Sequence, residues 1–222
     1  MQIIQYNAII SSFLSITLFF IGLILFARNT KSFLHRLFFA MCLSHSIMFF
    51  GILFISLSKI SQDVYFWFKI ANLGLIPYIA VSTHFCFAIS GISINRKKFF
   101  WVILYIPAIF LLYNYFFNFN GFTVSLLKNG ELFFSLNKTS FSYVYFSSYF
   151  ALYFVVSLFV LFYGIIKPAN NKQKMQSKIL FYAKLITFIF YCYELFIQAQ
   201  NKEYRPFDQT PFTIIIWVIA IT

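Results

Sequence analysis

Glu194 is the residue of this sequence most suited to chemistry, because it interrupts a long apolar run. It lies in YCYELFIQAQ, and Tyr191 and Gln198 stand one helical turn away on either side, on the same helix face. A carboxyl group among apolar residues is costly to bury and usually has a reason to be there. Two interpretations stay open: a pocket or proton-sensitive group, and a structural carboxylate that pairs with a neighbouring helix or meets interfacial water.

Lys69, in the segment WFKIANLG, is the natural partner for Glu194, since we expect both residues at similar depth in their helices. Asn72 follows about one turn later and extends the same polar network. A buried ion pair of this kind more often sets the register of two helices than it binds a ligand. The sequence therefore predicts a candidate polar network of Lys69, Asn72 and Glu194, with ligand binding as the alternative role.

His84 and His45 lie inside two other apolar runs, and neither belongs to a metal-binding motif such as HExxH. Each is either a polar packing residue or a group that senses pH or contacts a ligand. The three cysteines also lie in apolar runs without CxxC spacing, which indicates small packing residues rather than disulfides or metal ligands.

Enzymatic chemistry is not indicated. No nucleophile, base and oxyanion donor can be argued to converge, and the seven glycines are isolated, so there is no phosphate-binding loop. We expect no catalytic residue, no metal site and no cofactor. The net charge of +12 would suit nucleic acid, but the Lys and Arg residues form short clusters between apolar runs, so we expect no nucleic-acid partner.

The composition requires lipid as the solvent. Hydrophobic residues make up 61% of the 222 positions and charged residues 10%, whereas soluble domains carry about 25% charged residues. Runs of roughly twenty apolar residues are long enough for a helix to cross about 30 Å of hydrocarbon. Six such runs are expected to form helices near residues 7–27, 37–58, 65–92, 99–117, 141–166 and 180–200.

A seventh helix is expected from Pro211 to Thr222, but twelve residues reach only about 18 Å. We therefore expect an all-α transmembrane fold, a seven-helix bundle in which the last helix is short or truncated. Residues 1–222 would form a single membrane domain, with no soluble output domain. Lys184, one turn into the sixth run, is expected to extend its amine to the lipid headgroups.

Orientation follows from the positive-inside rule, because basic residues near helix ends resist translocation. Three alternate loops carry basic clusters without acidic residues: Arg28, Lys31 and Arg36; Arg96, Lys97 and Lys98; and Lys167, Lys172, Lys174 and Lys178. All acidic residues except Glu194 fall on the other side. We expect a bacterial cytoplasmic (inner) membrane protein with its N-terminus outside and its C-terminus inside.

The longest outer connection predicts a small β-hairpin. Two β-prone runs in FTVSLLKNGELFFSL flank Asn129-Gly130, residues that favour a type I′ turn. A lone hairpin is marginal in water, so we expect it to lie across the extracellular mouth of the bundle, between the fourth and fifth helices.

The third run, YFWFKIANLGLIPYIAVSTHFCFAISG, resembles the N-terminal seven-transmembrane sensor region of bacterial histidine kinases, a region also related to some diguanylate cyclases. The resembling positions are a Trp, a basic residue, a Gly, a Pro and His-Phe, here Trp67, Lys69, Gly74, Pro77, His84 and Phe85. WVILYIPAIFLLY, with Pro107, and the hairpin are also similar to it. The resemblance implies a receptor that passes a helix movement to a cytoplasmic output domain.

The leading hypothesis is therefore a sensory, signal-transducing membrane module that detects an extracellular or membrane-borne signal. Its expected partners are the lipid bilayer, an unidentified small ligand and a cytoplasmic output protein, and an oligomer is compatible with the sequence. The chain would be a fragment, a shortened gene product or a stand-alone module. The alternatives are a small transporter or channel, and a structural membrane subunit.

Overall fold

A computed structural model of the protein describes residues 2–92, 98–117, 122–126, 132–136 and 140–200. Within these ranges, only the backbone is described for residues 2–7, 98, 122–126, 132–136, 142–143, 190–191 and 193–200. The described part is helical apart from two short strands. Its helices are α1 (Gln2–Arg28), α2 (Phe33–Leu57), α3 (Ser61–Ile89), α4 (Lys98–Phe117), α5 (Phe141–Ile166) and α6 (Asn171–Gln200).

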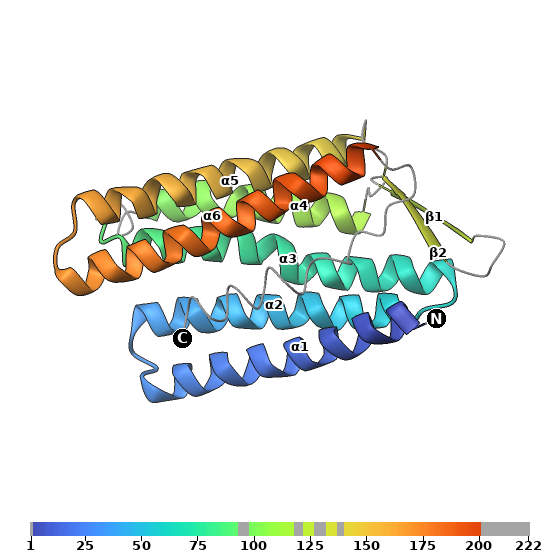
Figure 1. Cartoon of the computed structure of the whole chain (residues 1–222), viewed down its shortest axis with the longest axis horizontal. Coiled ribbons are helices and arrows are strands. Elements are labelled where there is room, and N and C mark those ends of the chain that lie inside the picture. Colours follow the sequence, from blue (N-terminus) through green and yellow to red (C-terminus); the bar gives the residue numbers. More distant parts are fainter. Residues whose placement is uncertain (1, 93–97, 118–121, 127–131, 137–139, 201–222) are drawn as a thin grey trace.

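The helices run alternately up and down along one long bundle (Figure 1). Helices α1, α3 and α5 end, and helices α2, α4 and α6 begin, at the same end of the bundle. We call it the basic end, because the described residues there include Arg28, Lys31, Arg36, Lys167, Lys172, Lys174 and Lys178. The strands lie at the opposite end, which we call the hairpin end.

The polarity of α1 is the reverse of that in a water-soluble helix. Its exposed face carries Ile9, Phe13 and Ile16, whereas Ser11 and Ser15 lie on its buried face. Apolar side chains on the outside and hydroxyls on the inside suit a hydrocarbon solvent and not water. Five helical segments are long and apolar enough to cross a membrane: Ala8–Arg28, Phe33–Leu57, Ser61–Ile89, Phe99–Phe117 and Val144–Ile166.

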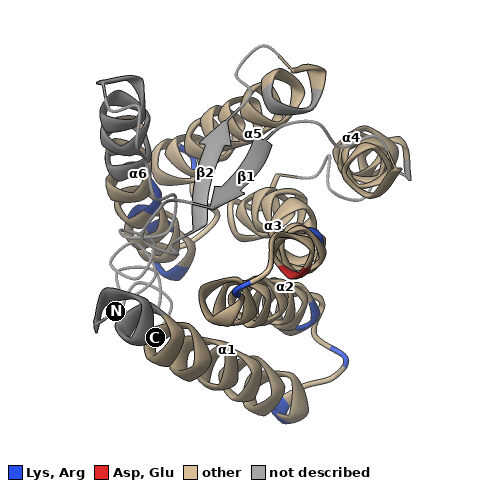
Figure 2. Cartoon of the chain, turned by 90° about the vertical axis from the view of Figure 1, so that its right-hand side faces the viewer, with Lys and Arg blue, Asp and Glu red and all other residues tan. Residues whose placement is uncertain are grey.

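α3 is the central helix of the bundle, and it contacts α2, α4, α5 and α6 (Figure 2). α1 packs on α2 at the periphery, where Ser15 and Ser46 exchange hydrogen bonds. Each hydroxyl donates to the other residue's carbonyl oxygen, at 2.9 Å and 2.8 Å. In a membrane such interhelical bonds add to packing, because no water competes for these groups.

Two glycines allow the unusually close approach of α2 and α3. A Cβ at Gly51 would lie 2.5 Å from the backbone nitrogen of Ala71, and a Cβ at Gly74 would collide with the backbone of Ser44 and Met48. Small residues at membrane helix interfaces let the two backbones meet in this way. The α2–α3 pair therefore packs backbone against backbone at these two glycines.

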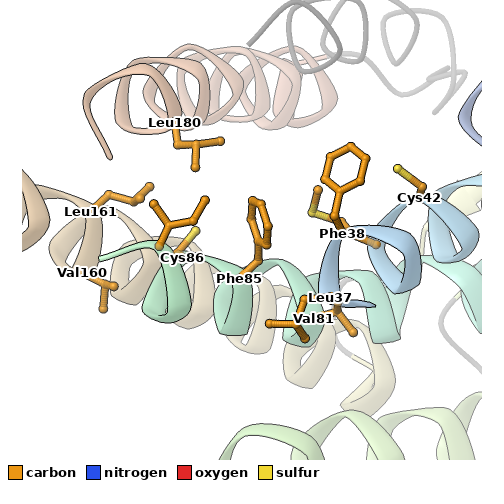
Figure 3. Packing of buried hydrophobic residues seen from close by; sticks show 11 residues of the cluster. Leu37, Phe38, Cys42, Val81, Phe85, Cys86, Val160, Leu161 and Leu180 are labelled. Atoms are coloured by element: carbon orange, nitrogen blue, oxygen red, sulfur yellow. The ribbon is translucent and has the colours of Figure 1, made fainter. Parts of the chain in front are cut away.

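A cluster of buried apolar side chains joins α2, α3, α5 and α6 near the basic end (Figure 3). Leu180 of α6 and Leu161 of α5 lie around Cys86 of α3, and Phe85 and Phe38 continue the cluster toward α2. These apolar contacts position the polar residues that lie between them.

Strands β1 (Phe122–Leu126) and β2 (Leu132–Leu136) pair antiparallel, with Phe122 opposite Leu136 and Leu126 opposite Leu132. β1 contacts α3. The predicted turn at Asn129-Gly130 lies outside the described residues, as does the predicted seventh helix from Pro211.

The helix predictions near residues 99–117 and 141–166 agree with α4 and α5 almost to the residue. The sixth prediction was too short, because α6 begins at Asn171 and not near residue 180. Its first turns carry Lys172, Lys174 and Lys178, so they do not belong to the apolar run from which the helix was predicted.

Candidate functional site

Among the described Lys, Arg, Asp and Glu side chains, that of Lys184 is the most deeply buried, with 3% of its surface exposed. Its Nζ donates a hydrogen bond of 2.8 Å to the Ser82 hydroxyl on α3 and lies 5.0 Å from the centre of the Phe154 ring on α5. An amine over an aromatic face is stabilised by the ring's negative face. Lys184 thus ties α6 to both α3 and α5.

The expectation that Lys184 extends its amine to the lipid headgroups is wrong. That expectation considered only its depth along the helix and not the face it occupies. Ser177, Leu180 and Lys184 follow one another at spacings of three and four residues, and all three are buried. The 3.6-residue period therefore placed Lys184 on the inner face, which was a signal available in the sequence.

We call the polar residues between α3 and α6 the polar seam: Ser82 and Cys86 on α3, Ser90 at the C-cap of α3, and Ser177 and Lys184 on α6. The first three are spaced by four residues and so lie on one face. All five are buried. The seam runs from Lys184 toward the basic end, parallel to the helix axes.

Gly164 of α5 closes the seam near the basic end. A Cβ there would lie 2.6 Å from the Ser177 hydroxyl and 2.9 Å from the Ser90 hydroxyl. Neither hydroxyl has a hydrogen-bond partner among the described atoms. A buried hydroxyl without a partner costs roughly 1–3 kcal/mol, so this part of the seam is less well satisfied than the Lys184–Ser82 contact.

His45 lies beside the seam on α2. Its ring centre is 3.7 Å from that of Tyr78 on α3 and 6.2 Å from that of Phe49. His45 and Lys184 are also close enough to interact electrostatically. The arrangement packs an imidazole of α2 against a phenol of α3.

His84 is fully buried in an aromatic setting. Its Nδ1 lies 2.9 Å from the Tyr105 hydroxyl of α4, and the Trp101 ring meets it edge to face at 4.0 Å. Phe33 at the start of α2 and Phe100 of α4 are further ring neighbours. His84 therefore links α3 to α4 and α2 at the basic end. Whether it is a packing residue or a group that senses pH or contacts a ligand stays a prediction.

Lys69 donates a hydrogen bond of 2.9 Å to the carbonyl oxygen of Phe116, in the last turn of α4. A cation at a helix C-terminus meets orphan carbonyls and the negative end of the helix dipole. Asn72 is buried, and its amide donates to Phe68 one turn back in its own helix. The structure thus brings Lys69 to α4, while Asn72 bonds within α3.

Tyr191, Glu194 and Gln198 lie in the last three turns of α6, so their backbone is helical. Their side chains are outside the described part of the structure. The pairing of Lys69 with Glu194 therefore stays a prediction.

Metal binding has no support in the described residues, where no three His, Cys, Asp or Glu side chains gather closely enough to hold an ion. The seam offers hydroxyl, thiol and amine groups between α3 and α6. Such groups can exchange hydrogen bonds when one helix moves along another.

Apolar helices around a buried polar seam define a polytopic membrane protein. Residues 9–222 match the family described as the N-terminal 7TM region of histidine kinase. Because this match covers nearly all of the sequence, the chain belongs to that family, and the resemblance seen in the third helix is confirmed. No curated protein and no solved structure was found to match it.

Proposed function

We propose that this chain detects an extracellular or membrane-borne signal and relays it to a cytoplasmic output domain or partner. Family membership supports the sensory role. The observation that carries the relay is the Lys184–Ser82 hydrogen bond, which joins α6 to the central helix inside the bundle. The family region is non-catalytic, so the chemistry of the output belongs elsewhere.

The relay is a change in the position of α6 against α3. Placing an amine among hydrocarbon costs about 2.5–3.5 kcal/mol at a membrane helix centre, so Lys184 favours positions with a polar partner. A small displacement of α6 would exchange Ser82 for another seam residue. Discrete positions of this kind are what a signal can select, provided that it binds one of them more tightly.

We propose that the basic end faces the cytoplasm. Arg28, Lys31 and Arg36 on one connection and Lys167 on another match the excess of basic residues in cytoplasmic loops. The N-terminus is then outside and the C-terminus inside a bacterial inner membrane.

The complete membrane domain in this proposal comprises residues 1–222 and seven helices. α6 crosses with the five apolar helices, and a seventh helix begins at Pro211. The paired strands β1 and β2 form an extracellular hairpin over the mouth of the bundle, near Lys69 and Glu194, where a small ligand would bind.

A chimaera tests the relay. The catalytic core of a histidine kinase is joined behind residue 222, and autophosphorylation is measured in proteoliposomes. Lys184→Met keeps an unbranched side chain that is one atom shorter but removes the amine, and we expect it to change the basal rate at least threefold. Lys178→Met, at an exposed position on the same helix, is the matched control.

Equal rates for the two variants and the parent would refute the relay through Lys184. A transporter predicts a different result: substrate flux into proteoliposomes that lack any kinase core, lost in Lys184→Met.

A further inference from the structure

A groove opens on the side of the bundle between α4 and α5, with α3 as its floor. It encloses about 420 Å³, within the range of about 300–1,000 Å³ typical of ligand pockets. We call it the lateral groove, and its lining includes Phe87, Phe100, Leu104, Pro107, Tyr149 and Leu152. It is separate from the polar seam, which lies between α3 and α6.

The lining of the lateral groove is almost entirely carbon. Three buried hydroxyls in its wall are already used by the protein. Tyr149 donates to the Ile76 carbonyl, Tyr153 to the Leu104 carbonyl, and Thr83 to the Ile79 carbonyl. The groove thus suits an occupant that is hydrocarbon along its whole length.

The mouth of the groove faces lipid. Ile103 of α4 and Leu152 of α5 line it and are 57% and 60% exposed, and both helices are apolar enough to cross a membrane. An occupant therefore enters sideways from the bilayer and needs no path through water.

The length of the groove fits one leaflet. Along α5 it extends from Tyr145 to Val156, which is about 16 Å at 1.5 Å per residue. Half of the hydrocarbon core is about 15 Å. Phe100 near the start of α4 lines the end of the groove toward the basic end, and Tyr145 near the start of α5 lines its end toward the opposite end of the bundle.

We propose that the lateral groove binds one acyl chain of a bilayer phospholipid. The acyl chain lies along α5 and packs against Pro107 and Tyr153, where α4 and α5 are in contact. The role of the groove as the entry point of a membrane-borne signal rests on the proposed function. Its role as a lipid site does not depend on that function, so lipid binding and signalling can each fail without the other.

Photolabelling tests the site directly. The full chain is placed in vesicles of phosphatidylethanolamine and phosphatidylglycerol that contain a tracer phosphatidylethanolamine with a diazirine in the middle of one acyl chain. After irradiation, labelled residues are mapped by mass spectrometry. We expect labelling of Leu152 and Val156 at least fivefold above that of Phe159, which is 69% exposed on α5 outside the groove.

Leu152→Trp fills the mouth of the groove and should lower labelling of Val156 at least fivefold. Val155→Trp, on the same helix but outside the lining, should leave it unchanged. Ser148→Trp, at another exposed lining position, replaces Leu152→Trp if that variant is not monodisperse. Even labelling of all lipid-facing residues, or full labelling of Val156 in both mouth variants, overturns the proposal.

Discussion

Single side chains near the basic end hold this bundle together through polar contacts that hydrophobicity alone does not reveal. Lys184 reaches Ser82, and the Ser157 hydroxyl lies 3.0 Å from that of Thr83. Small hydroxyl residues such as Thr83 and Ser82 often lie between membrane helices. Their partners on α5 and α6 cannot be read from the sequence, because tertiary packing determines them.

Ser82 and Ser177 should respond differently to the loss of their hydroxyls. Ser82→Ala removes a described acceptor of the Lys184 amine, and we expect a loss of about 1–3 kcal/mol in the free energy of unfolding. Ser177→Ala removes a hydroxyl without a described partner, so its stability should be unchanged or higher. Thermal unfolding in detergent compares the two variants, and equal losses would contradict the assignment.

A double-mutant cycle at Lys69 and Glu194 tests their predicted pairing. Lys69→Met alone should cost about 0.5–1.5 kcal/mol, because it removes the hydrogen bond to the Phe116 carbonyl. If the pair exists, Glu194→Gln should show a coupling energy above about 0.5 kcal/mol with Lys69→Met. Additive losses would mean that Lys69 serves only the end of α4.

At the scale of the elements, apolar length predicted the helices well where the helix is apolar over nearly its whole length, as α4 and α5 are. α6 extends nine residues earlier than predicted, because helical hydrogen bonding continues through its polar first turns. The close approach of α2 and α3 was not predictable, since isolated glycines in an apolar run do not reveal which backbone they meet.

Gly74→Ala tests the close packing of α2 against α3. The added Cβ meets backbone atoms of Ser44 and Met48, which cannot move as a flexible side chain does. Overpacking of this kind costs roughly 1–3 kcal/mol. Leu73→Ala, at the neighbouring exposed position, is the control and should change the melting temperature far less. Equal melting temperatures for Gly74→Ala and the parent would show that the helices can separate.

The joint between α4 and α5 allows a compensation experiment. Pro107 has no N–H for the Ile103 carbonyl, and the Tyr153 hydroxyl lies 3.3 Å from that oxygen and 2.7 Å from that of Leu104. Tyr153→Phe should therefore destabilise the parent protein more than it destabilises Pro107→Ala, in which the N–H is present. Melting temperatures of the four proteins measure this. Equal losses of melting temperature from Tyr153→Phe in both backgrounds would show that the Tyr153 hydroxyl does not compensate for the N–H that Pro107 lacks.

For the whole molecule, loop charge and helix direction define a testable orientation. Lys59→Cys lies at the hairpin end and Asn170→Cys at the basic end, each in a Cys192→Ser background. A membrane-impermeant maleimide added to intact cells should label the first and not the second, and both should react after the membrane is opened. The reverse pattern would invert the proposed topology.

The reciprocal serine bonds between α1 and α2 also bear on biogenesis. The connection between these helices, residues 29–32, is short, and the Ser15–Ser46 bonds satisfy polar groups of both without help from later helices. Once the ribosome has released residue 58, these two helices can leave the translocation machinery as a closed pair. The hydroxyls that would hinder the insertion of either helix alone are then hidden from lipid before α3 leaves the ribosome.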